Sequence, residues 1–296
     1  MNKPLFSPGH TACAGCGQSQ AARLVIDASG PNTIVANNTG CLEVFSTTYP
    51  ESAWEVPWIH SLFENAAAVA SGIEAALIYL GKKDAINVIA QGGDGGTADI
   101  GLQALSGMLE RGHDVLYVCY DNEAYMNTGV QRSGLTPFDA NTTTSPVGSR
   151  SAGNIRPKKP MPEIALAHGI PYVATASASF PQDLQRKVKK AIAIKGPKYI
   201  QIHVPCPLGW RYQTGLTYEV GKAAVETGLY PLIEYENGKL TTVRKLSFLK
   251  PVEEYLKLQG RFKHLLDNPD EVKKIQEIAD NNIKKYGLKA EAQANN

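Results

Sequence analysis

The sequence predicts an α/β fold in which a mostly parallel sheet is covered by helices on both faces. Apolar runs of strand length recur between residues 33 and 204, and segments with helical spacing lie between them. Strands that alternate with helices favour parallel pairing, because a parallel connection has to cross over the sheet. The chain has 296 residues, of which 43% are hydrophobic, so it can bury a large core.

The expected elements follow one another in a regular order. The apolar runs predict strands at residues 33–37, 85–91, 114–120, 172–175 and 198–204. Good helix formers at helical spacing predict helices at 64–80, 99–111, 162–168 and 181–194. In folds of this class, ligands bind beyond the carboxyl ends of the strands. Motifs that follow a strand are therefore the first candidates for a functional site.

Two segments interrupt this alternation. Residues 131–160 are polar, rich in Gly, Pro, Ser and Thr, and too long for an ordinary connection. Such a loop is a functional lid, a subunit contact or a mobile segment. From residue 217 a charged helical pattern predicts a C-terminal helical extension, 217–296, with a frayed polar tail. The α/β domain, including an N-terminal Cys-x-x-Cys segment, then comprises residues 1–216.

The bulk composition excludes some partners. The chain carries 30 Lys and Arg against 28 Asp and Glu, and its formal net charge of +2 gives no reason to expect nucleic acid. The N-terminal residues lack the apolar run of a signal peptide, and no later run is long enough to cross a bilayer. We therefore expect a soluble cytoplasmic protein with no membrane partner, whose thiols stay reduced.

The cysteines are candidates for metal or cluster ligation. Cys13 and Cys16 form Cys-Ala-Gly-Cys in a glycine-containing turn, where two thiolates can converge on one centre. The pair alone is compatible with a zinc knuckle, a redox dithiol or a structural role. Cys41 and Cys206 each follow an expected strand in a turn-like setting, and Cys-x-x-Cys with two distant cysteines suits a cubane cluster. Cys119 lies in an apolar run and is expected to be a buried strand cysteine.

A glycine-rich acidic motif follows the strand expected at 85–91. Asp94 stands in Gly-Gly-Asp-Gly-Gly, where backbone amides can close on phosphate oxygens and the carboxylate can hold Mg²⁺. Asn122 lies 28 residues later, after the next strand, so its amide oxygen is a second candidate ligand, with the Ala124 carbonyl as a third. The alternative is a helix N-cap aspartate and a turn asparagine, each without a ligand.

These motifs occur with others that point to one family. The sequence contains Cys-x-x-Cys-Gly, Thr-Gly-Cys-Leu-Glu-Val, Pro-Trp-Ile-His, Phe-Glu-Asn-Ala, Gly-Gly-Asp-Gly-Gly, Tyr-Asp-Asn-Glu-Ala-Tyr-Met-Asn-Thr-Gly and Pro-Cys-Pro. Together they resemble the β subunit of the 2-oxoacid:ferredoxin oxidoreductases, most of all the multi-subunit pyruvate enzymes. The resemblance extends to about residue 272, and it implies a thiamine-diphosphate-binding fold.

The resemblance also implies roles for individual residues. A 4Fe-4S cluster would be held by Cys13, Cys16, Cys41 and Cys206. Mg²⁺ would be held by Asp94, Asn122 and the Ala124 carbonyl. Thiamine diphosphate would be contacted by Gln18, Cys41, Gly93, Asp94, Gly95, Gly96, Asn122, Ala124 and Asn127. Of these, Asn127 lies beside the thiazolium in the family and is the candidate for orienting the reacting substrate.

The activity implied by the resemblance is oxidative decarboxylation of pyruvate with coenzyme A, with electrons passing singly to the cluster and then to ferredoxin. The glutamate that activates the aminopyrimidine comes from the α subunit in this family, so the active site would lie at a subunit interface. The other expected partners are the γ subunit and a ferredoxin-like δ subunit. Glu43, Glu64, His10 and His60 are expected to be structural.

Three competing interpretations remain. A transketolase-like or decarboxylase half would use Asp94 and Asn122 and leave the cysteines idle. A non-catalytic iron-sulfur or zinc scaffold subunit would use the cysteines and leave the glycine-rich motif idle. Within the family, the substrate could instead be 2-oxoisovalerate, another branched 2-oxoacid, 2-oxoglutarate or oxalate, because most of the substrate pocket belongs to other chains.

Overall fold

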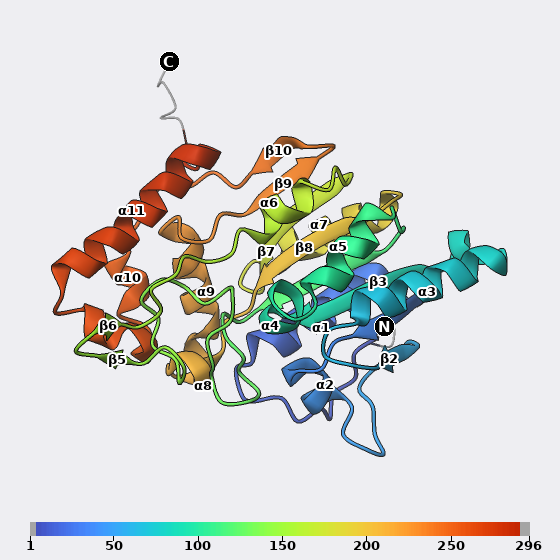
Figure 1. Cartoon of the computed structure of the whole chain (residues 1–296), viewed down its shortest axis with the longest axis horizontal. Coiled ribbons are helices and arrows are strands. Elements are labelled where there is room, and N and C mark those ends of the chain that lie inside the picture. The colour runs from blue at the N-terminus through green and yellow to red at the C-terminus, as the bar shows by residue number, and fades with distance from the viewer. Residues whose placement is uncertain (1–3, 291–296) are drawn as a thin grey trace.

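An eight-stranded sheet with helices on both faces organises the computed structural model, which describes residues 4–290 (Figure 1). The strand order is β10-β9-β7-β8-β4-β3-β1-β2. Parallel pairing runs from β2 through to β7, and β9 and β10 add an antiparallel edge. The strands are β1 Thr33–Asn37, β2 Trp58–His60, β3 Asn87–Gly93, β4 Leu116–Asp121, β7 Tyr172–Ser177, β8 Lys198–His203, β9 Ile233–Glu236 and β10 Lys239–Val243. The predicted mostly parallel sheet is confirmed.

Two helical layers cover the parallel strands. One layer consists of α1 Gly17–Ser29, α2 Cys41–Ser46 and α7 Pro181–Ala193, and the other of α3 Ala66–Tyr79, α5 Leu102–Glu110 and α6 Met161–Leu166. Successive residues of β3 point to opposite layers, since Ile89 packs with the first and Val88 and Ala90 pack with the second. Both faces of the strand are buried, which explains why it reads as a continuous apolar run.

Several element bounds differ from those expected from the sequence. Strands β3 and β4 begin two residues later than predicted and continue to Gly93 and Asp121. The helix predicted at 99–111 is the shorter α5, and a separate short helix that was not predicted, α4 Asp94–Ala98, precedes it, with Gly101 between the two. A side chain at Gly101 would stand 2.0 Å from the Gly96 carbonyl oxygen, so the chain turns sharply there. Helix α1, helix α2 and strand β2 carry no pattern that the sequence analysis recognised.

The C-terminal segment is only partly helical, which corrects the prediction of a helical extension. It contains α9 Thr217–Glu226, α10 Glu253–Leu256 and α11 Pro269–Tyr286, but β9 and β10 form a hairpin that joins the main sheet through β7. Asn237 and Gly238 make the hairpin turn with φ values of 48° and 77°. Asn-Gly between short strands is a strong hairpin signal, and the charged residues around it obscured this signal.

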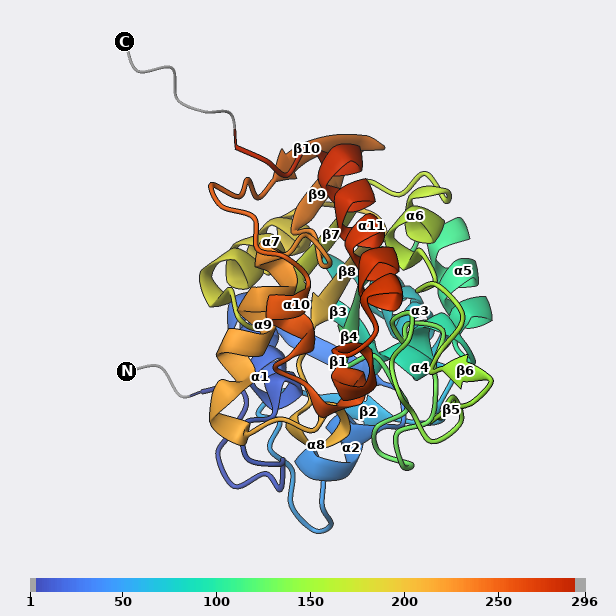
Figure 2. The same ribbon diagram turned by 90° about the vertical axis from the view of Figure 1, so that its left-hand side faces the viewer.

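The C-terminal helices lie beside the edge where β4, β7 and β8 end. In Figure 2, α9, α10 and α11 stand in front of these strands, and the loop that carries β5 Val147–Gly148 and β6 Ser151–Ala152 runs next to α11. Short helices complete the connections: η1 Lys83–Ala85, α8 Pro207–Trp210, η2 Thr214–Leu216 and η3 Gly260–Leu265.

Within residues 4–290 no helix is both long and apolar enough to span a bilayer. Most of the polar tail that we expected to be frayed, residues 291–296, lies outside the described part of the chain.

Candidate functional site

The ends of β3 and β4 bring together the three groups that the sequence analysis singled out for Mg²⁺. Gly93 pairs in register with Tyr120, so Asp94 and Asn122 emerge side by side from neighbouring parallel strands. One polar atom of the Asn122 amide lies 3.0 Å from Asp94 Oδ1 and 2.8 Å from the Ala124 carbonyl oxygen. As an amino group it donates a hydrogen bond to both. As an oxygen it completes a set of three oxygens at the spacing, about 3 Å, of neighbouring ligands around octahedral Mg²⁺.

Asp94 is buried in surroundings that disfavour its charge. Its side chain is 2% exposed and accepts a hydrogen bond from the Ser133 hydroxyl. Burial, and then the charge of Asp121, raise the pKa of Asp94 well above its ordinary value. A cation bound among these oxygens would reverse the effect, because positive charge favours the ionised carboxylate. The donor set and its electrostatics therefore fit a divalent cation.

Glycine occupies the positions around Asp94 for different physical reasons. A side chain at Gly95 would stand 2.2 Å from the Tyr125 ring, and one at Gly96 would stand 3.1 Å from the Asn38 amide and 3.2 Å from the Phe63 ring. At Gly93 an added side chain meets no protein atom within 4 Å. Protein packing thus accounts for Gly95 and Gly96, while Gly93 leaves open space beside the oxygens.

Cys13, Cys16, Cys41 and Cys206 meet next to this edge. The N–H of Gly17 donates to the Pro205 carbonyl oxygen at 3.2 Å, which places the start of α1 against the loop that carries Cys206. Burial, and then the charges of Cys206, Cys16 and Asp94, raise the pKa of Cys41 to about 12. Burial raises the pKa of Cys206 to about 11, with smaller contributions from Cys16 and Cys13.

The four cysteines are candidate ligands of a multi-iron cluster. All five cysteines are free. Among residues 4–290, no three His, Cys, Asp or Glu side chains stand close enough to share one metal ion. A cubane separates its thiolate ligands by its own width. The Gly209 N–H also points at Cys206 Sγ, 3.4 Å away, a contact that favours the thiolate. The four cysteines fit such a cluster, whose iron would offset the raised thiol pKa values.

The remaining candidates are divided between buried and exposed positions. Gln18 is 4% exposed, and its Oε1 has no hydrogen-bond partner in the described chain, which is compatible with a ligand contact. Asn127 is exposed in the turn after Met126. Cys119 is fully buried on β4, as expected. His60 shares a hydrogen bond of 2.7 Å with Thr39 Oγ1, and His10 accepts one of 3.4 Å from the Ala12 N–H, so both are structural histidines.

The loop 131–160 folds back over the same strand ends, a role that sequence reasoning missed. Besides Ser133, its Lys158 donates to Asp121 Oδ2 at 2.8 Å and to Glu123 Oε1 at 2.6 Å. Gly134 donates from its N–H to Asp99 Oδ2 at 2.9 Å. The Lys-Lys-Pro sequence at the end of the loop was a visible signal, since buried carboxylates need cations. The tip, with β5 and β6, is partly exposed.

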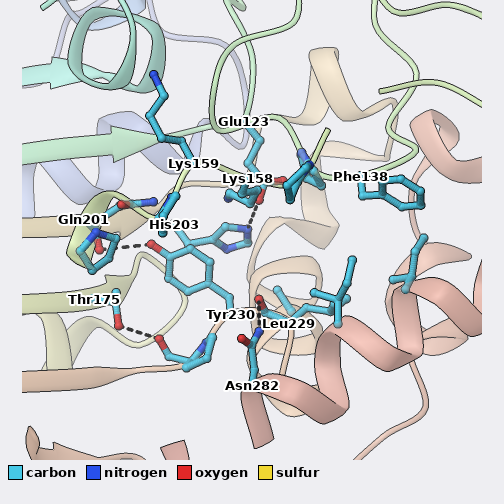
Figure 3. A pocket seen from close by; sticks show the side chains of 18 of the residues that line it. Glu123, Phe138, Lys158, Lys159, Thr175, Gln201, His203, Leu229, Tyr230 and Asn282 are labelled. Atoms are coloured by element: carbon cyan, nitrogen blue, oxygen red, sulfur yellow. Dashed lines mark hydrogen bonds and ion pairs between the residues drawn. The ribbon is translucent and has the colours of Figure 1, made fainter. Parts of the chain in front are cut away.

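One cavity near the C-terminal helices is separate from these oxygens. It has a volume of about 320 Å³ and lies between the ends of β7 and β8 and helix α11 (Figure 3). Within the described residues, each lysine that lines it already has a partner: Lys158 bonds to Glu123, Lys159 to Asp99 and Lys285 to Glu163. Without an unpaired cation the cavity does not suit a diphosphate. The edge around Asp94 is therefore the candidate functional site.

Comparison with known proteins first identifies the class. Residues 38–202 match the family described as thiamine pyrophosphate enzyme, C-terminal TPP binding domain. This range includes Asp94, Asn122 and Ala124, and it comprises more than half of the chain. The fold is thus that of a thiamine-diphosphate enzyme.

Individual relatives then identify the family. The chain is 61% identical to pyruvate synthase subunit PorB of Methanosarcina barkeri over 97% of this chain and 98% of the relative. It is 52% identical to ketoisovalerate oxidoreductase subunit VorB of Pyrococcus abyssi over 90% and 88%. A solved 2-oxoglutarate:ferredoxin oxidoreductase from Magnetococcus marinus matches at a TM-score of 0.57 and 25% identity, over 75% of this chain and 80% of that one. The chain belongs to the 2-oxoacid:ferredoxin oxidoreductase family, as a subunit of the PorB type.

Proposed function

We propose that this chain is the thiamine-diphosphate-binding subunit of an enzyme that oxidatively decarboxylates pyruvate with coenzyme A to acetyl-CoA and CO₂, and reduces ferredoxin. One observation carries the proposal: a set of oxygens suited to Mg²⁺ and four converging cysteines lie next to each other on a single chain. A transketolase-like half would leave the cysteines idle. A scaffold subunit would leave the oxygens idle.

The cofactor assignment follows from the residues present. Asp94, Asn122 and the Ala124 carbonyl would hold Mg²⁺ and, through it, the diphosphate. Gly93 would let the backbone approach the diphosphate, Gly95 and Gly96 would line it, and Gln18, Cys41 and Asn127 would contact the rest of the cofactor. When bound, thiamine diphosphate supplies the nucleophilic carbon and the electron sink for decarboxylation. Asn127, which is exposed, would orient the substrate as its catalytic role.

The cluster assignment rests on the other half of the site. Cys13, Cys16, Cys41 and Cys206 would ligate a 4Fe-4S cluster, which accepts electrons one at a time. Cys41 lies within electrostatic reach of both centres, because the charges of Cys206 and of Asp94 both raise its pKa. We also propose a cytoplasmic location, where such thiols stay reduced.

Partner subunits would complete the active site. Large apolar side chains of segment 44–62, which leads out of α2 and through β2, are exposed: Val44 at 47%, Tyr49 at 95%, Ile59 at 44% and Leu62 at 55%. Exposed apolar side chains gathered in one segment mark a protein interface. We assign this segment to the α subunit, which would supply the glutamate that activates the cofactor, and we expect γ and ferredoxin-like δ subunits in the same complex.

The substrate has one specific competitor. The identity of 52% to a ketoisovalerate oxidoreductase subunit makes a branched 2-oxoacid the second candidate. An anaerobic assay of the co-purified complex with coenzyme A, ferredoxin, and either pyruvate, 2-oxoisovalerate, 2-oxoglutarate or oxalate would test this. We expect the highest kcat/KM with pyruvate. Higher kcat/KM with 2-oxoisovalerate would reassign the substrate, and the absence of ferredoxin reduction with all four would refute the proposed function.

A further inference from the structure

The backbone at Glu123 adopts a conformation that its surroundings have to maintain. Glu123 stands between the proposed ligands Asn122 and Ala124, and its φ of 70° lies in the left-handed region that side chains other than glycine avoid. Such a residue persists only where neighbouring groups determine its conformation. The contacts of Glu123 therefore decide how Asn122 and Ala124 face Asp94.

The Glu123 carboxylate is buried between two cations. Arg261 Nη2 lies 2.6 Å from Oε2, and Lys158 Nζ lies 2.6 Å from Oε1. Burial alone would raise the pKa of Glu123, but Lys158 and Arg261 outweigh it and lower the pKa. The Thr136 hydroxyl donates to the Glu123 carbonyl oxygen at 2.7 Å. The residue is held by its side chain and its backbone at once.

Arg261 also acts on Asn122, the residue before Glu123, through the ring of Trp210. Its guanidinium lies 3.7 Å from the centre of the Trp210 ring, and Trp210 Nε1 donates to the Asn122 carbonyl oxygen at 2.8 Å. The Trp210 N–H donates to the Cys206 carbonyl oxygen at 2.9 Å. One stack thus connects the proposed metal ligands with a proposed cluster ligand.

Arg261 is itself fixed. Its side chain is 3% exposed, Nε donates to Gln259 Oε1 at 2.8 Å, and Nη2 donates to the Tyr255 hydroxyl at 3.0 Å. These partners belong to the C-terminal segment, which packs around Trp210, Tyr255 and Phe262 as a separate core cluster. Arg261 therefore transmits the position of that core to a turn 138 residues earlier in the sequence.

We propose that Arg261 is a positioning residue for the metal-binding turn: through Glu123 and Trp210 it holds residues 121–125 so that Asn122 and Ala124 face Asp94. This inference rests on the proposed function, because it concerns the proposed Mg²⁺ ligands. Arg261 touches neither metal nor substrate, so its effect is on cofactor affinity and on the mobility of the turn. The planar guanidinium makes both the ion pair with Glu123 and the stacking contact with Trp210. A lysine would keep the positive charge but could neither stack on the ring nor present several N–H donors in one plane.

The test uses the purified complex with Arg261→Met and Arg261→Lys. Hydrogen exchange of residues 121–127, measured without added Mg²⁺ or thiamine diphosphate, is expected to speed up in both variants and more in Arg261→Met. The Mg²⁺ concentration for half-maximal thiamine diphosphate binding is expected to rise about tenfold in Arg261→Met, as for other groups that orient a metal ligand, and less in Arg261→Lys. Arg244→Met is the matched control, because Arg244 also stacks on a ring, that of Phe180, away from the turn.

The outcomes separate this inference from the proposed function. Wild-type exchange together with a wild-type Mg²⁺ requirement in a folded Arg261→Met complex would overturn the positioning role. If that variant does not fold, the same result in Arg261→Lys overturns it. Faster exchange in the variants, combined with no Mg²⁺-dependent thiamine diphosphate binding by the wild type, would refute the proposed function and leave the role of Arg261 in the turn standing.

Discussion

Asp94 and Glu234 are buried carboxylates on the same sheet, and their surroundings are opposite. Asp94, after β3, makes no ion pair among residues 4–290, and burial followed by the charge of Asp121 raises its pKa. Glu234, on β9, lies 2.6 Å from Arg186 and 3.2 Å from Lys190, and accepts a hydrogen bond from the Tyr172 hydroxyl at 2.8 Å. Burial alone would raise the pKa of Glu234, but these partners lower it to about 2.

The difference separates a binding site from a structural pair. Removing a carboxylate from water costs free energy, and a protein offsets that cost with cations and hydrogen bonds wherever the carboxylate only supports the fold. The chain does this at Glu234, whereas within residues 4–290 no cation pairs directly with Asp94. Asp94 is therefore the position where a cation from outside the chain is expected. The predictions below test this contrast.

The largest effect on activity is expected at the proposed iron-sulfur cluster, which lies next to Asp94. Cys16→Ala removes one of the four convergent thiolates, so the iron content of the purified complex should fall by about four atoms and ferredoxin reduction should stop. Iron analysis, electron paramagnetic resonance and the ferredoxin assay measure these losses. Cys119→Ala is the control, since Cys119 is buried on β4 and should not affect the iron. Full iron content in Cys16→Ala would contradict the ligand assignment.

The next effect is expected at Asp94 itself. Asp94→Ala removes the only charged member of the oxygen set, and Mg²⁺-dependent binding of thiamine diphosphate should weaken by about a hundredfold. Equilibrium dialysis with varied Mg²⁺ measures the change. Asp84→Ala is the matched control, because Asp84 is 97% exposed and forms an ion pair with Lys195. Equal cofactor occupancy in the Asp94 and Asp84 variants would show that Asp94 is a structural carboxylate like Glu234.

A smaller effect, on stability, is expected where carboxylates are already paired. Lys158→Met leaves the buried Asp121 and Glu123 with fewer cations, and the free energy of unfolding should fall by about 3 kcal/mol. Denaturant unfolding measures the loss. In the exposed pair of Lys195 and Asp84, Lys195→Met should change stability by less than about 0.5 kcal/mol. Similar losses in the free energy of unfolding for Lys158→Met and Lys195→Met would show that the buried pairs contribute no more to stability than the exposed pair.

The smallest effect concerns acid stability at Glu234. Because its folded pKa is lowered to about 2, Glu234 contributes stability that is present above its unfolded pKa of about 4.5 and is lost as the pH falls toward 2. Glu234→Gln should therefore flatten the decline in stability between pH 5 and pH 2. Unfolding measured across this range checks the prediction. An unchanged decline in stability at acidic pH would mean that Arg186, Lys190 and Tyr172 do not stabilise the ionised form of Glu234.

Sequence reasoning located the local part of the site. Asp94 and Asn122 each follow an apolar run, and in a parallel sheet neighbouring runs end at the same edge, so their meeting follows from pattern and spacing. The hairpin at Asn237 and Gly238 was also readable, but the sequence analysis passed over it as part of a helical extension. Asn237 and Gly238 are the visible signal of the turn, but the charged residues around them favour the prediction of a helix.

Contacts between distant segments were beyond the reach of pattern and spacing. Nothing in the sequence around Cys206 says that Gly17 packs against Pro205, the contact that brings Cys206 to Cys16. The functions of Ser133 and Lys158 were hidden in a loop whose composition suggested only a lid, a contact or mobility. Arg261 belongs to no recognisable sequence motif, because its proposed role depends on contacts with Glu123 and Trp210, which are distant in the sequence.

What the sequence alone determined was the alternation of strands and helices, the two ligand motifs and the family. These depend on residue periodicity and on short segments, whose geometry is local. Only the tertiary structure decided which groups surround each carboxylate, and hence why Glu234 and Glu123 are paired with cations while Asp94 makes no ion pair within the described residues. The physical reason is that electrostatic energies depend on distances in space, and those distances join residues that lie far apart along the chain.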